Sequence, residues 1–295
     1  ADAYRRGFEL GAFVTLDNLH PLEAWPELFR NRNVLVRFDP GRGDGHHRYV
    51  RTAGAQSKFG IAPAQAKRLR ELADRLGLRI VGLHAHVGSG ILLPETWAET
   101  ALFLAELAET YFPDVRYLDV GGGLGVPERT GAPGLDLEAV EAHLHRFKTA
   151  HPRFELWLEP GRFLVAEAGV LLARVTQVKE KGGARYAGVE TGMNSLIRPA
   201  LYGAYHEIVN LTRLDAPATQ TVDVVGPICE TGDVLGHGRR LPDTREGDVL
   251  LIAQAGAYGA VMSSHYNRRP PAREVFLPVG ASAAVSPTPE NAASV

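Results

Sequence analysis

The chain has 295 residues, 45% of them hydrophobic and 22% charged, and a formal net charge of -2 at pH 7. These values fit a globular protein of one or two domains, and the lack of a basic surplus argues against partners such as nucleic acid or an anionic membrane. Because no apolar run approaches the roughly 20 residues of a membrane span and no signal-peptide pattern is present, we expect a cytoplasmic protein without a membrane segment.

The first part of the chain alternates apolar runs with amphipathic stretches. Five apolar runs are expected to form buried strands: Ala12 to Leu16, Val34 to Phe38, Ile80 to His86, Tyr117 to Val120 and Phe154 to Leu158. Helices are expected from Pro63 onward, from Pro94 to Tyr111 and from Leu137 to Thr149. This alternation predicts right-handed βαβ units and a parallel sheet, either an open doubly wound sheet or part of an eight-stranded barrel.

From about Gly169 onward, strand-like segments follow one another without long helices. We expect strands at Val170 to Val178, Arg185 to Val189, Thr221 to Cys229, Val249 to Ala253 and Glu274 to Leu277. The end of the chain is small, polar and proline-containing, as in disordered tails. The predicted organisation is an α/β domain at residues 1–168, a mostly β domain at 169–280 and a tail at 281–295.

A pair of histidines stands at the end of the third expected strand, in the run HAHVGSG. Side chains alternate between the two faces of a strand, so His84 and His86 point to the same side. Taken alone, such a pair also fits hydrogen-bonded core histidines or a zinc pair. The glycines and Ser89 that follow favour a ligand site, because ligands bind at the carboxyl ends of parallel strands.

Two further strand ends carry residues suited to a phosphate-bearing ligand. The run GGGLG, from Gly121 to Gly125, lets backbone N–H groups approach an anion closely, although such runs also occur as simple tight turns. The run EPGR places the carboxylate of Glu159 at a strand end and the guanidinium of Arg162 shortly after it. The carboxylate suits a pyridinium nitrogen, and Gly161 and Arg162 suit a phosphate or carboxylate; the alternative is a surface ion pair.

The second part of the chain contributes two more motifs, GPICETGD (Gly226 to Asp233) and AGAYGAVMSSHYNRRP (Ala255 to Pro270). The first places the only cysteine, Cys229, beside an acid, and the second sets a tyrosine between glycines. A lone cysteine is usually a buried, inert thiol, but the flanking Glu230 and Asp233 weaken that interpretation. One cysteine also excludes an internal disulfide and a multi-cysteine zinc site, and we predict no metal.

In this order and spacing, HAHVGSG, GGGLG, EPGR, CETGD and AGAYG resemble the alanine-racemase-type barrel decarboxylases that use pyridoxal phosphate. The runs SKFGI, MNSLIRPALYGAYH and YNRRPPAREV, which begin at Ser57, Met193 and Tyr266, are most similar to diaminopimelate decarboxylases. HVGSG and CETGD resemble the form found in fused aspartate kinase and decarboxylase proteins. The resemblance, from about residue 12 to 280, implies an α/β barrel followed by a mostly β domain, and decarboxylation of meso-diaminopimelate to L-lysine.

The resemblance also implies roles for individual residues. His86 would stack on the pyridine ring of the cofactor, and Glu159 would bind the ring nitrogen. The phosphate would be held by Ser89, Gly123, Gly161, Arg162 and Tyr258. The far end of an amino-acid substrate would be gripped by Arg198, Tyr202 and Glu230. Cys229 would enter the site from the other subunit and help to protonate the product carbanion, so the expected assembly is a homodimer with shared active sites and with His86 and Cys229 as catalytic residues.

The lysine that holds the cofactor in this family has no counterpart in the sequence. In the family it lies on the first barrel strand in a Y-A-x-K context, which none of the lysines present matches: Lys58, Lys67, Lys148, Lys179 and Lys181. In addition, only five expected strands precede the β domain, whereas a closed barrel has about eight. We therefore expect a partial TIM barrel of about the last five strands, without the lysine segment, and inactive as an isolated fragment.

Several alternatives stay open. A decarboxylase of ornithine, arginine or carboxynorspermidine would share these motifs, but Arg198 suits a carboxylate at the far end of the substrate better than a bare ammonium. A racemase is disfavoured because Glu159 stands where the racemases of this fold have an arginine, and an acid keeps the pyridine nitrogen protonated. A non-catalytic binding or regulatory homologue is favoured by the absent lysine and disfavoured by the retained cofactor motifs.

Overall fold

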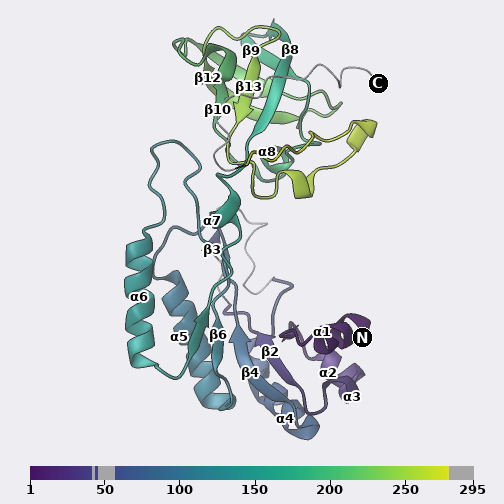
Figure 1. Ribbon diagram of the computed structural model, residues 1–295, viewed down its shortest axis with the longest axis vertical. Helices are drawn as coiled ribbons and strands as arrows, with labels where there is room; N and C mark the ends of the chain where they lie inside the picture. The colour runs from purple at the N-terminus through teal and green to yellow at the C-terminus, as the bar shows by residue number, and fades with distance from the viewer. Residues whose placement is uncertain (42–43, 46–56, 279–295) are drawn as a thin grey trace.

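The chain folds around two large sheets, one parallel and one mostly antiparallel (Figure 1). The computed structural model describes residues 1–41, 44–45 and 57–278. Within these ranges, no helix has both the length and the apolarity needed to cross a membrane. The tail predicted at residues 281–295 lies outside the described residues.

Five parallel strands form the first sheet, in the order β1-β2-β4-β6-β7. Their bounds are β1 Thr15–Leu16, β2 Asn33–Arg37, β4 Arg79–His84, β6 Tyr117–Asp119 and β7 Glu155–Trp157. All the strands predicted for this part are confirmed. The short strands β3 (Asp44–Gly45) and β5 (Gly88–Ser89) pair with each other outside this sheet. The order of the large sheet therefore follows the chain without a reversal.

Helices alternate with these strands. They are α1 Asp2–Glu9, α2 His20–Ala24, α3 Pro26–Phe29, α4 Ala66–Leu76, α5 Thr96–Tyr111, α6 Leu137–Ala150 and α7 Arg162–Val165, with a 3-10 turn, η2, at Pro63–Gln65. The three predicted helices are confirmed as η2 with α4, α5 and α6. Helix α4 buries an apolar face that includes Leu69 and Leu72, and it ends at Gly77, whose φ of 60° favours glycine. Helix α6 begins at Asp136, whose side chain accepts the N–H of Ala139.

One hydrophobic core joins the parallel sheet to its helices. Its largest fully buried side chains include Trp97, Phe29, Phe38, Phe112 and Phe154. The indole N–H of Trp97 on α5 also donates to the carbonyl oxygen of Gly122, at 2.9 Å. Packing of α5 in the core therefore also fixes the glycine run that follows β6.

The second sheet has six strands in the order β10-β13-β8-β9-β11-β12. Their bounds are β8 Leu171–Lys181, β9 Ala184–Val189, β10 Ile208–Asn210, β11 Gln220–Val225, β12 Val234–Leu241 and β13 Val249–Ile252. Short helical segments lie between or after them: α8 Arg198–Tyr202, η3 Leu211–Arg213, η4 Ala260–Met262 and η5 Tyr266–Arg268. The pairing is antiparallel apart from β9 with β11, which is parallel.

Four of the strands predicted for this part are confirmed, and one prediction is wrong. Residues 274–277 belong to none of the described strands, and Phe276 is 88% exposed, so their apolar pattern does not reflect burial. The strand predicted to reach Cys229 stops at Val225, because the buried carboxylate of Asp233 accepts the N–H of Ile228 and turns the chain. Strands β10 and β12 were not predicted; β10 is very short, and glycines interrupt the pattern of β12.

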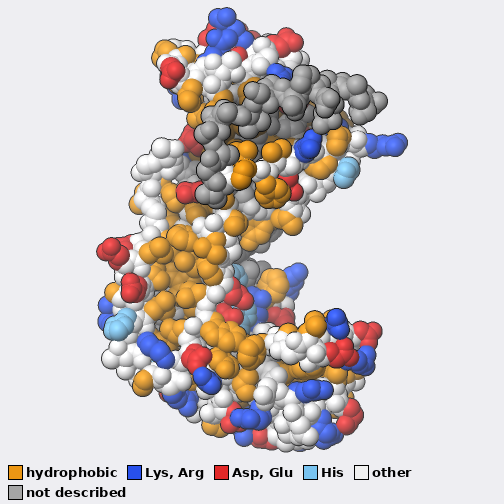
Figure 2. All heavy atoms as spheres, in the orientation of Figure 1, with side chains coloured by type: hydrophobic (Ala, Val, Ile, Leu, Met, Phe, Trp, Pro, Cys, Tyr) orange, Lys and Arg blue, Asp and Glu red, His pale blue; other side chains and the backbone are white. Residues whose placement is uncertain are grey.

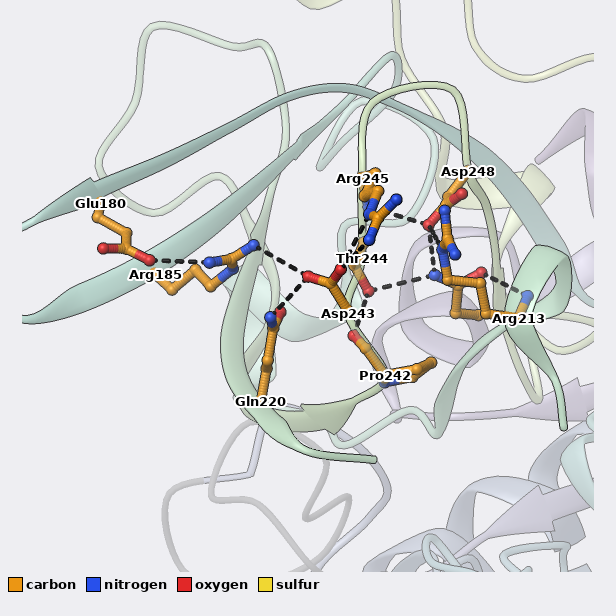
Figure 3. A network of polar contacts seen from close by, with 10 residues as sticks. Glu180, Arg185, Arg213, Gln220, Pro242, Asp243, Thr244, Arg245 and Asp248 are labelled. Carbon is orange, nitrogen blue, oxygen red and sulfur yellow. Dashed lines mark hydrogen bonds and ion pairs between the residues drawn. The ribbon is translucent and has the colours of Figure 1, made fainter. Parts of the chain in front are cut away.

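A network of polar contacts fastens one side of the second sheet (Figure 3). The buried carboxylate of Asp248, just before β13, accepts from Asn210 Nδ2 at 2.9 Å, from Arg213 Nε at 2.8 Å and from the backbone N–H of Arg245 at 2.9 Å. A more exposed neighbour, Asp243, accepts from Arg245 and Gln220. Burial alone would raise the pKa of Asp248, but the hydrogen bonds from Asn210, Arg245 and Arg213 lower it below its usual range.

We predict that Asp248→Ala destabilises the β domain strongly. The substitution strands three donors, and leaving buried donors unpaired costs about 2–4 kcal/mol in total. Because the folded pKa of Asp248 is depressed, its contribution is present near neutral pH and is lost as the pH falls through that pKa. Urea unfolding should therefore show a large difference between wild type and variant at pH 7 and a smaller one in acid.

Asp243→Ala is the matched control, because Asp243 belongs to the same network but its carboxylate remains open to solvent. We expect a much smaller loss of stability for this variant. Equal losses for Asp243→Ala and Asp248→Ala would contradict the importance of the buried contacts.

Candidate active site

The three motifs predicted to bind a ligand meet at the carboxyl ends of β4, β6 and β7. The parallel register pairs His84 with Asp119, and Asp119 with Trp157, so the residues that follow these strands emerge side by side. The molecule is hollowed next to this edge, between the N-terminal helices and the β domain, and charged and histidine side chains are visible inside the hollow (Figure 2). The sequence motifs therefore share one surface.

The glycine run after β6 holds the ring of His86. The N–H of Gly122 donates to His86 Nδ1 at 3.1 Å. Gly123 has a φ of 87°, and a Cβ placed there would lie 2.3 Å from the carbonyl oxygen of Gly88. Burial, followed by the neighbouring Arg37 and His84, lowers the pKa of His86 to about 4, although Glu159 acts in the opposite direction. At neutral pH His86 is thus an uncharged flat ring that accepts at Nδ1 and donates at Nε2.

A group of acids and one histidine lies beside His86. Nε2 of His84 is buried, has no hydrogen-bond partner among the described residues, and lies 3.6 Å from Oε2 of Glu159. The nearby His84 is the main cause that lowers the pKa of Glu159, assisted by His86 and Arg37 and opposed by partial burial. Burial raises the pKa of Asp119, even though its carboxylate accepts the N–H of Gly121 at 3.0 Å. Glu159 is therefore the acid that stays charged, and its side chain is only half-buried.

The two histidines of HAHVGSG have different partners. His86 Nδ1 is occupied by the N–H of Gly122, whereas His84 gathers with Asp119 and Glu159, their nearest polar atoms lying within 4.8 Å of one another. Nε2 of His84 and the charged Glu159 form a polar end that is suited to a basic ring nitrogen.

The opposite end of the site suits an anion. Nη2 and Nε of Arg162, the first residue of α7, lie 3.2 and 3.4 Å from Oγ of Ser89. The same guanidinium stacks over the ring of Tyr258 at 4.9 Å, and burial is the main cause that lowers its pKa. A Cβ at Gly161 would meet nothing within 4 Å, so the space beside Arg162 is open. A cation, a hydroxyl and a glycine turn together are suited to a phosphate.

The predicted substrate residues of α8 lie next to the anion end. Arg198 is 6% exposed and lines, with Arg162, Glu128 and Tyr205, a pocket of about 340 Å³ between the first domain and the β domain. Burial, followed by Arg162, lowers the pKa of Arg198 to about 10, so it remains a cation at neutral pH. Tyr202 lies close enough to influence both arginines.

Two predicted site residues lie elsewhere on the same chain. Cys229 is exposed and accepts from Nδ2 of Asn267 at 3.0 Å, while Glu230 accepts from the hydroxyl of Tyr266. In the part of the chain that the structure describes, these contacts bind Cys229 and Glu230 to η5 rather than to the residues around Glu159 and Arg162.

The sequence did not single out Asp119 or Arg37 as site residues, although Glu159 contributes to the raised pKa of Asp119 and Arg37 contributes to the lowered pKa of Glu159. The signal for Asp119 was present, because a carboxylate inside an apolar run just before GGGLG is unusual in a buried strand. Arg37 carried no comparable local signal, since only the pairing of β2 with β4 brings it opposite His84.

The fold and the site define a protein that holds a flat, phosphate-bearing aromatic cofactor at the carboxyl ends of parallel strands. A model of the family described as "Pyridoxal-dependent decarboxylase, C-terminal sheet domain" matches residues 13–256. The chain is also 38% identical over 294 residues to the diaminopimelate decarboxylase of Methanothermobacter thermautotrophicus, covering 95% of this chain and 68% of that protein. The chain belongs to the pyridoxal-dependent decarboxylase family.

Other relatives agree. The diaminopimelate decarboxylase of Aquifex aeolicus is 37% identical over 280 residues, covering 92% of this chain and 65% of the relative. The crystal structure of diaminopimelate decarboxylase from Helicobacter pylori complexed with L-lysine has a TM-score of 0.82 at 29% identity, covering 91% of this chain and 68% of that one. The chain thus spans about two thirds of the length of these relatives. Pyridoxal phosphate is the cofactor of the family, and the residues described above fit its ring, its nitrogen and its phosphate.

We predict that Gly123→Ala weakens cofactor binding. A residue with a side chain at positive φ costs about 1–2 kcal/mol, so together with the clash against Gly88 the Kd of pyridoxal phosphate should rise at least about tenfold. Equilibrium dialysis with absorbance detection measures this Kd in the enzyme that contains the chain. Gly134→Ala is the control, because its Cβ would meet only Pro127 at 3.8 Å. Unchanged cofactor binding by Gly123→Ala would show that the tight turn is dispensable.

Proposed function

We propose that this chain provides the cofactor-binding and substrate-binding parts of a diaminopimelate decarboxylase, which converts meso-diaminopimelate to L-lysine and carbon dioxide. The observation that carries the proposal is the buried cation Arg198 in a pocket beside Arg162. Diaminopimelate keeps a second carboxylate far from the bond that breaks, and a buried guanidinium is suited to bind it. Substrates such as ornithine end in an ammonium, for which this cationic pocket is unfavourable. The names of the relatives support the same choice.

When bound, pyridoxal phosphate supplies an electron-poor ring that accepts the electron pair left on Cα after carbon dioxide departs. The residues of this chain hold the ring in the state that this chemistry requires. Glu159 remains a carboxylate and stabilises a proton on the ring nitrogen, while neutral His86 covers a ring face without adding a competing positive charge. We assign the phosphate to Ser89, Gly123, Gly161, Arg162 and Tyr258, and the distal end of the substrate to Arg198 and Tyr202.

We further propose that the five parallel strands are part of an eight-stranded barrel. Their order follows the chain, as in a barrel, whereas a doubly wound sheet reverses its order. Phe13, Tyr117 and Trp157 form an aromatic cluster with ring centroids 4.7 to 5.5 Å apart, and Phe13 is 56% exposed, which fits a sheet surface that further strands cover. In this arrangement the barrel domain would end near residue 168, the β domain would follow, and the cofactor lysine would come from the strands that complete the barrel.

We predict that Arg198→Ala impairs turnover of diaminopimelate without removing the cofactor. Loss of a charge-assisted contact costs about 1.5–3 kcal/mol, so kcat/KM should fall roughly 10- to 150-fold. The assay follows lysine formation by the full enzyme containing this chain, with absorbance of bound cofactor recorded in parallel. Arg174→Ala, which alters an exposed arginine on β8, is the control. Loss of cofactor from Arg198→Ala would move Arg198 to the phosphate site, and turnover of ornithine or arginine in place of diaminopimelate by the wild type would refute the proposed substrate.

The active sites of a homodimer would be shared, with Cys229 and Glu230 reaching the site of the other subunit. The exposure of Cys229 and its contact with η5, away from Glu159, support this proposal. In such a dimer Cys229 helps to protonate the product carbanion, and Glu230 contacts the distal end of the substrate.

Mixing two inactive variants tests this arrangement. A chain carrying Cys229→Ala is combined with a chain carrying Glu159→Ala, and the subunits are allowed to exchange. Each heterodimer then has one site with both defects and one with neither, so random exchange should restore about a quarter of the wild-type activity. Proof of exchange by mass spectrometry without any gain in activity would place Cys229 within the site of its own chain.

A further inference from the structure

Arg198 is in contact with another buried side chain, His206, which belongs to neither the cofactor residues nor the substrate residues assigned above. His206 is 0% exposed, and its Nε2 lies 3.0 Å from Nη1 of Arg198. Arg198 begins α8, whereas His206 lies two residues before β10. The contact therefore fastens the helix that carries Arg198 to the second sheet.

The partners of His206 determine which of its ring nitrogens carries the proton. Nδ1 lies 2.8 Å from the carbonyl oxygen of Ala253, and a carbonyl oxygen can only accept, so Nδ1 must donate. A guanidinium can only donate, so Nε2 must accept from Arg198. Both contacts are satisfied only by the neutral imidazole with its proton on Nδ1.

The surroundings keep His206 neutral. Burial lowers its pKa most, the bond to Ala253 opposes this, and the cations Arg198, Arg239 and Arg162 lower the pKa further, to about 4. A protonated ring would point an N–H at the N–H of Arg198 and lose the contact. At neutral pH the acceptor at Nε2 is therefore always available.

A neutral partner suits an arginine that must bind a ligand. An aspartate or glutamate in this place would also orient the guanidinium, but it would neutralise the charge and compete with an incoming carboxylate. The imidazole occupies one N–H of Arg198 and leaves its positive charge for the pocket. The remaining donors of Arg198 can then face that pocket, beside Arg162.

The position of His206 is set by the sheet. Ile208 pairs with Ile252, and the N–H of Ala253 donates to the carbonyl oxygen of Glu207 at 2.8 Å, which continues the β10–β13 ladder to the residue next to His206. Two hydrogen bonds therefore join this segment to Ala253, one from the backbone N–H of Ala253 to Glu207 and one from the His206 ring to the carbonyl oxygen of Ala253. They hold the ring in place, so that its Nε2 is a rigid acceptor for Arg198.

We propose that His206 is a positioning residue, which orients Arg198 toward the distal carboxylate of the substrate and so contributes to selection of substrates that carry one. The proposal rests on the proposed function, because it takes Arg198 as the ligand of that carboxylate. In this proposal His206 acts through Arg198 and does not itself touch the substrate.

Two amide substitutions separate the acceptor of His206 from its donor. In His206→Gln the side-chain oxygen can reach the position of Nε2 and accept from Arg198, whereas His206→Asn can replace only the donor at the position of Nδ1. In the full enzyme containing this chain, we expect His206→Asn to raise the KM for diaminopimelate roughly tenfold or more, with kcat and cofactor absorbance nearly unchanged. His206→Gln should restore most of the affinity.

Two inhibitors and a double mutant locate the effect. L-lysine retains the distal carboxylate, so its inhibition should weaken in His206→Asn in parallel with KM, whereas inhibition by cadaverine, which has no carboxylate, should not change. In an Arg198→Ala background, His206→Asn should have almost no further effect, because the two residues act as one unit. Full additivity, or an equal loss in kcat and cofactor binding, would overturn the proposal.

A measurement on the wild type covers the case in which His206→Asn fails to fold. Nitrogen-15 NMR of the histidines should show His206 neutral and protonated at Nδ1 at pH 7; a charged ring, or a proton at Nε2, would overturn the proposal. Absence of lysine formation by the wild type would instead count against the proposed function. In that case the L-lysine and cadaverine affinities, measured by calorimetry, still decide the role of His206.

Discussion

The parallel register of the first sheet places charged side chains in one row beneath the ligand site. Arg37 pairs with His84 across β2 and β4, His84 pairs with Asp119 across β4 and β6, and Glu159 follows β7 on the same edge. Each charge in this row is flanked by a partner of opposite sign or by a histidine. The more exposed carboxylate of Glu159 can therefore stay ionised next to the buried carboxylate of Asp119. A shift of one residue in any strand would turn these side chains to the other face.

The loops that carry the rest of the site depend on the same register. The glycine run follows Asp119 directly, and its N–H groups reach both Asp119 and His86, while its carbonyl at Gly122 accepts from Trp97 on α5. A β-carbon at Gly122 would lie 2.2 Å from the carbonyl oxygen of Glu159, which shows how closely the loops after β6 and β7 approach. Core packing, loop conformation and the charge of Glu159 are therefore linked over a few ångströms.

Much of the fold was predictable because its pattern is local. The strands of the first sheet and the helices α4, α5 and α6 follow from apolar periodicity and from end signals such as Gly77. The strand prediction at residues 274–277 is wrong because apolar composition does not reveal whether a neighbouring strand is available for pairing. The pattern of β12 does not predict a strand because Gly236 and Gly238 interrupt it. Pairing across a sheet is a tertiary property that a local pattern cannot contain.

The candidate site was predictable where its residues form short runs, as His86, Glu159 and Arg162 do, and less so where long-range contacts create it. Arg37 reaches the site only through the pairing of β2 with β4. His206 closes the run MNSLIRPALYGAYH, but its importance depends on the carbonyl of Ala253, 47 positions further along the chain. Sequence motifs thus reveal the residues expected to contact the ligand more readily than they reveal the residues that position those contact residues.

The two buried histidines show how the protein keeps charge for its ligands. His86 and His206 both have a pKa lowered to about 4, in each case by burial first and by neighbouring cations second. Each ring accepts a hydrogen bond from a donor next to the site: His86 from the N–H of Gly122, and His206 from the guanidinium of Arg198. Because both rings are uncharged, they do not neutralise the charge of a neighbouring group. The ionised groups Glu159, Arg162 and Arg198 consequently keep their charges for the ring nitrogen, phosphate and carboxylate that the proposed function assigns to them. For His206 the depressing cations include Arg198 and Arg162, the two arginines proposed to bind anionic groups, so there the electrostatic field that would attract the ligands also keeps the supporting histidine neutral. For His86 this effect comes from Arg37 together with His84.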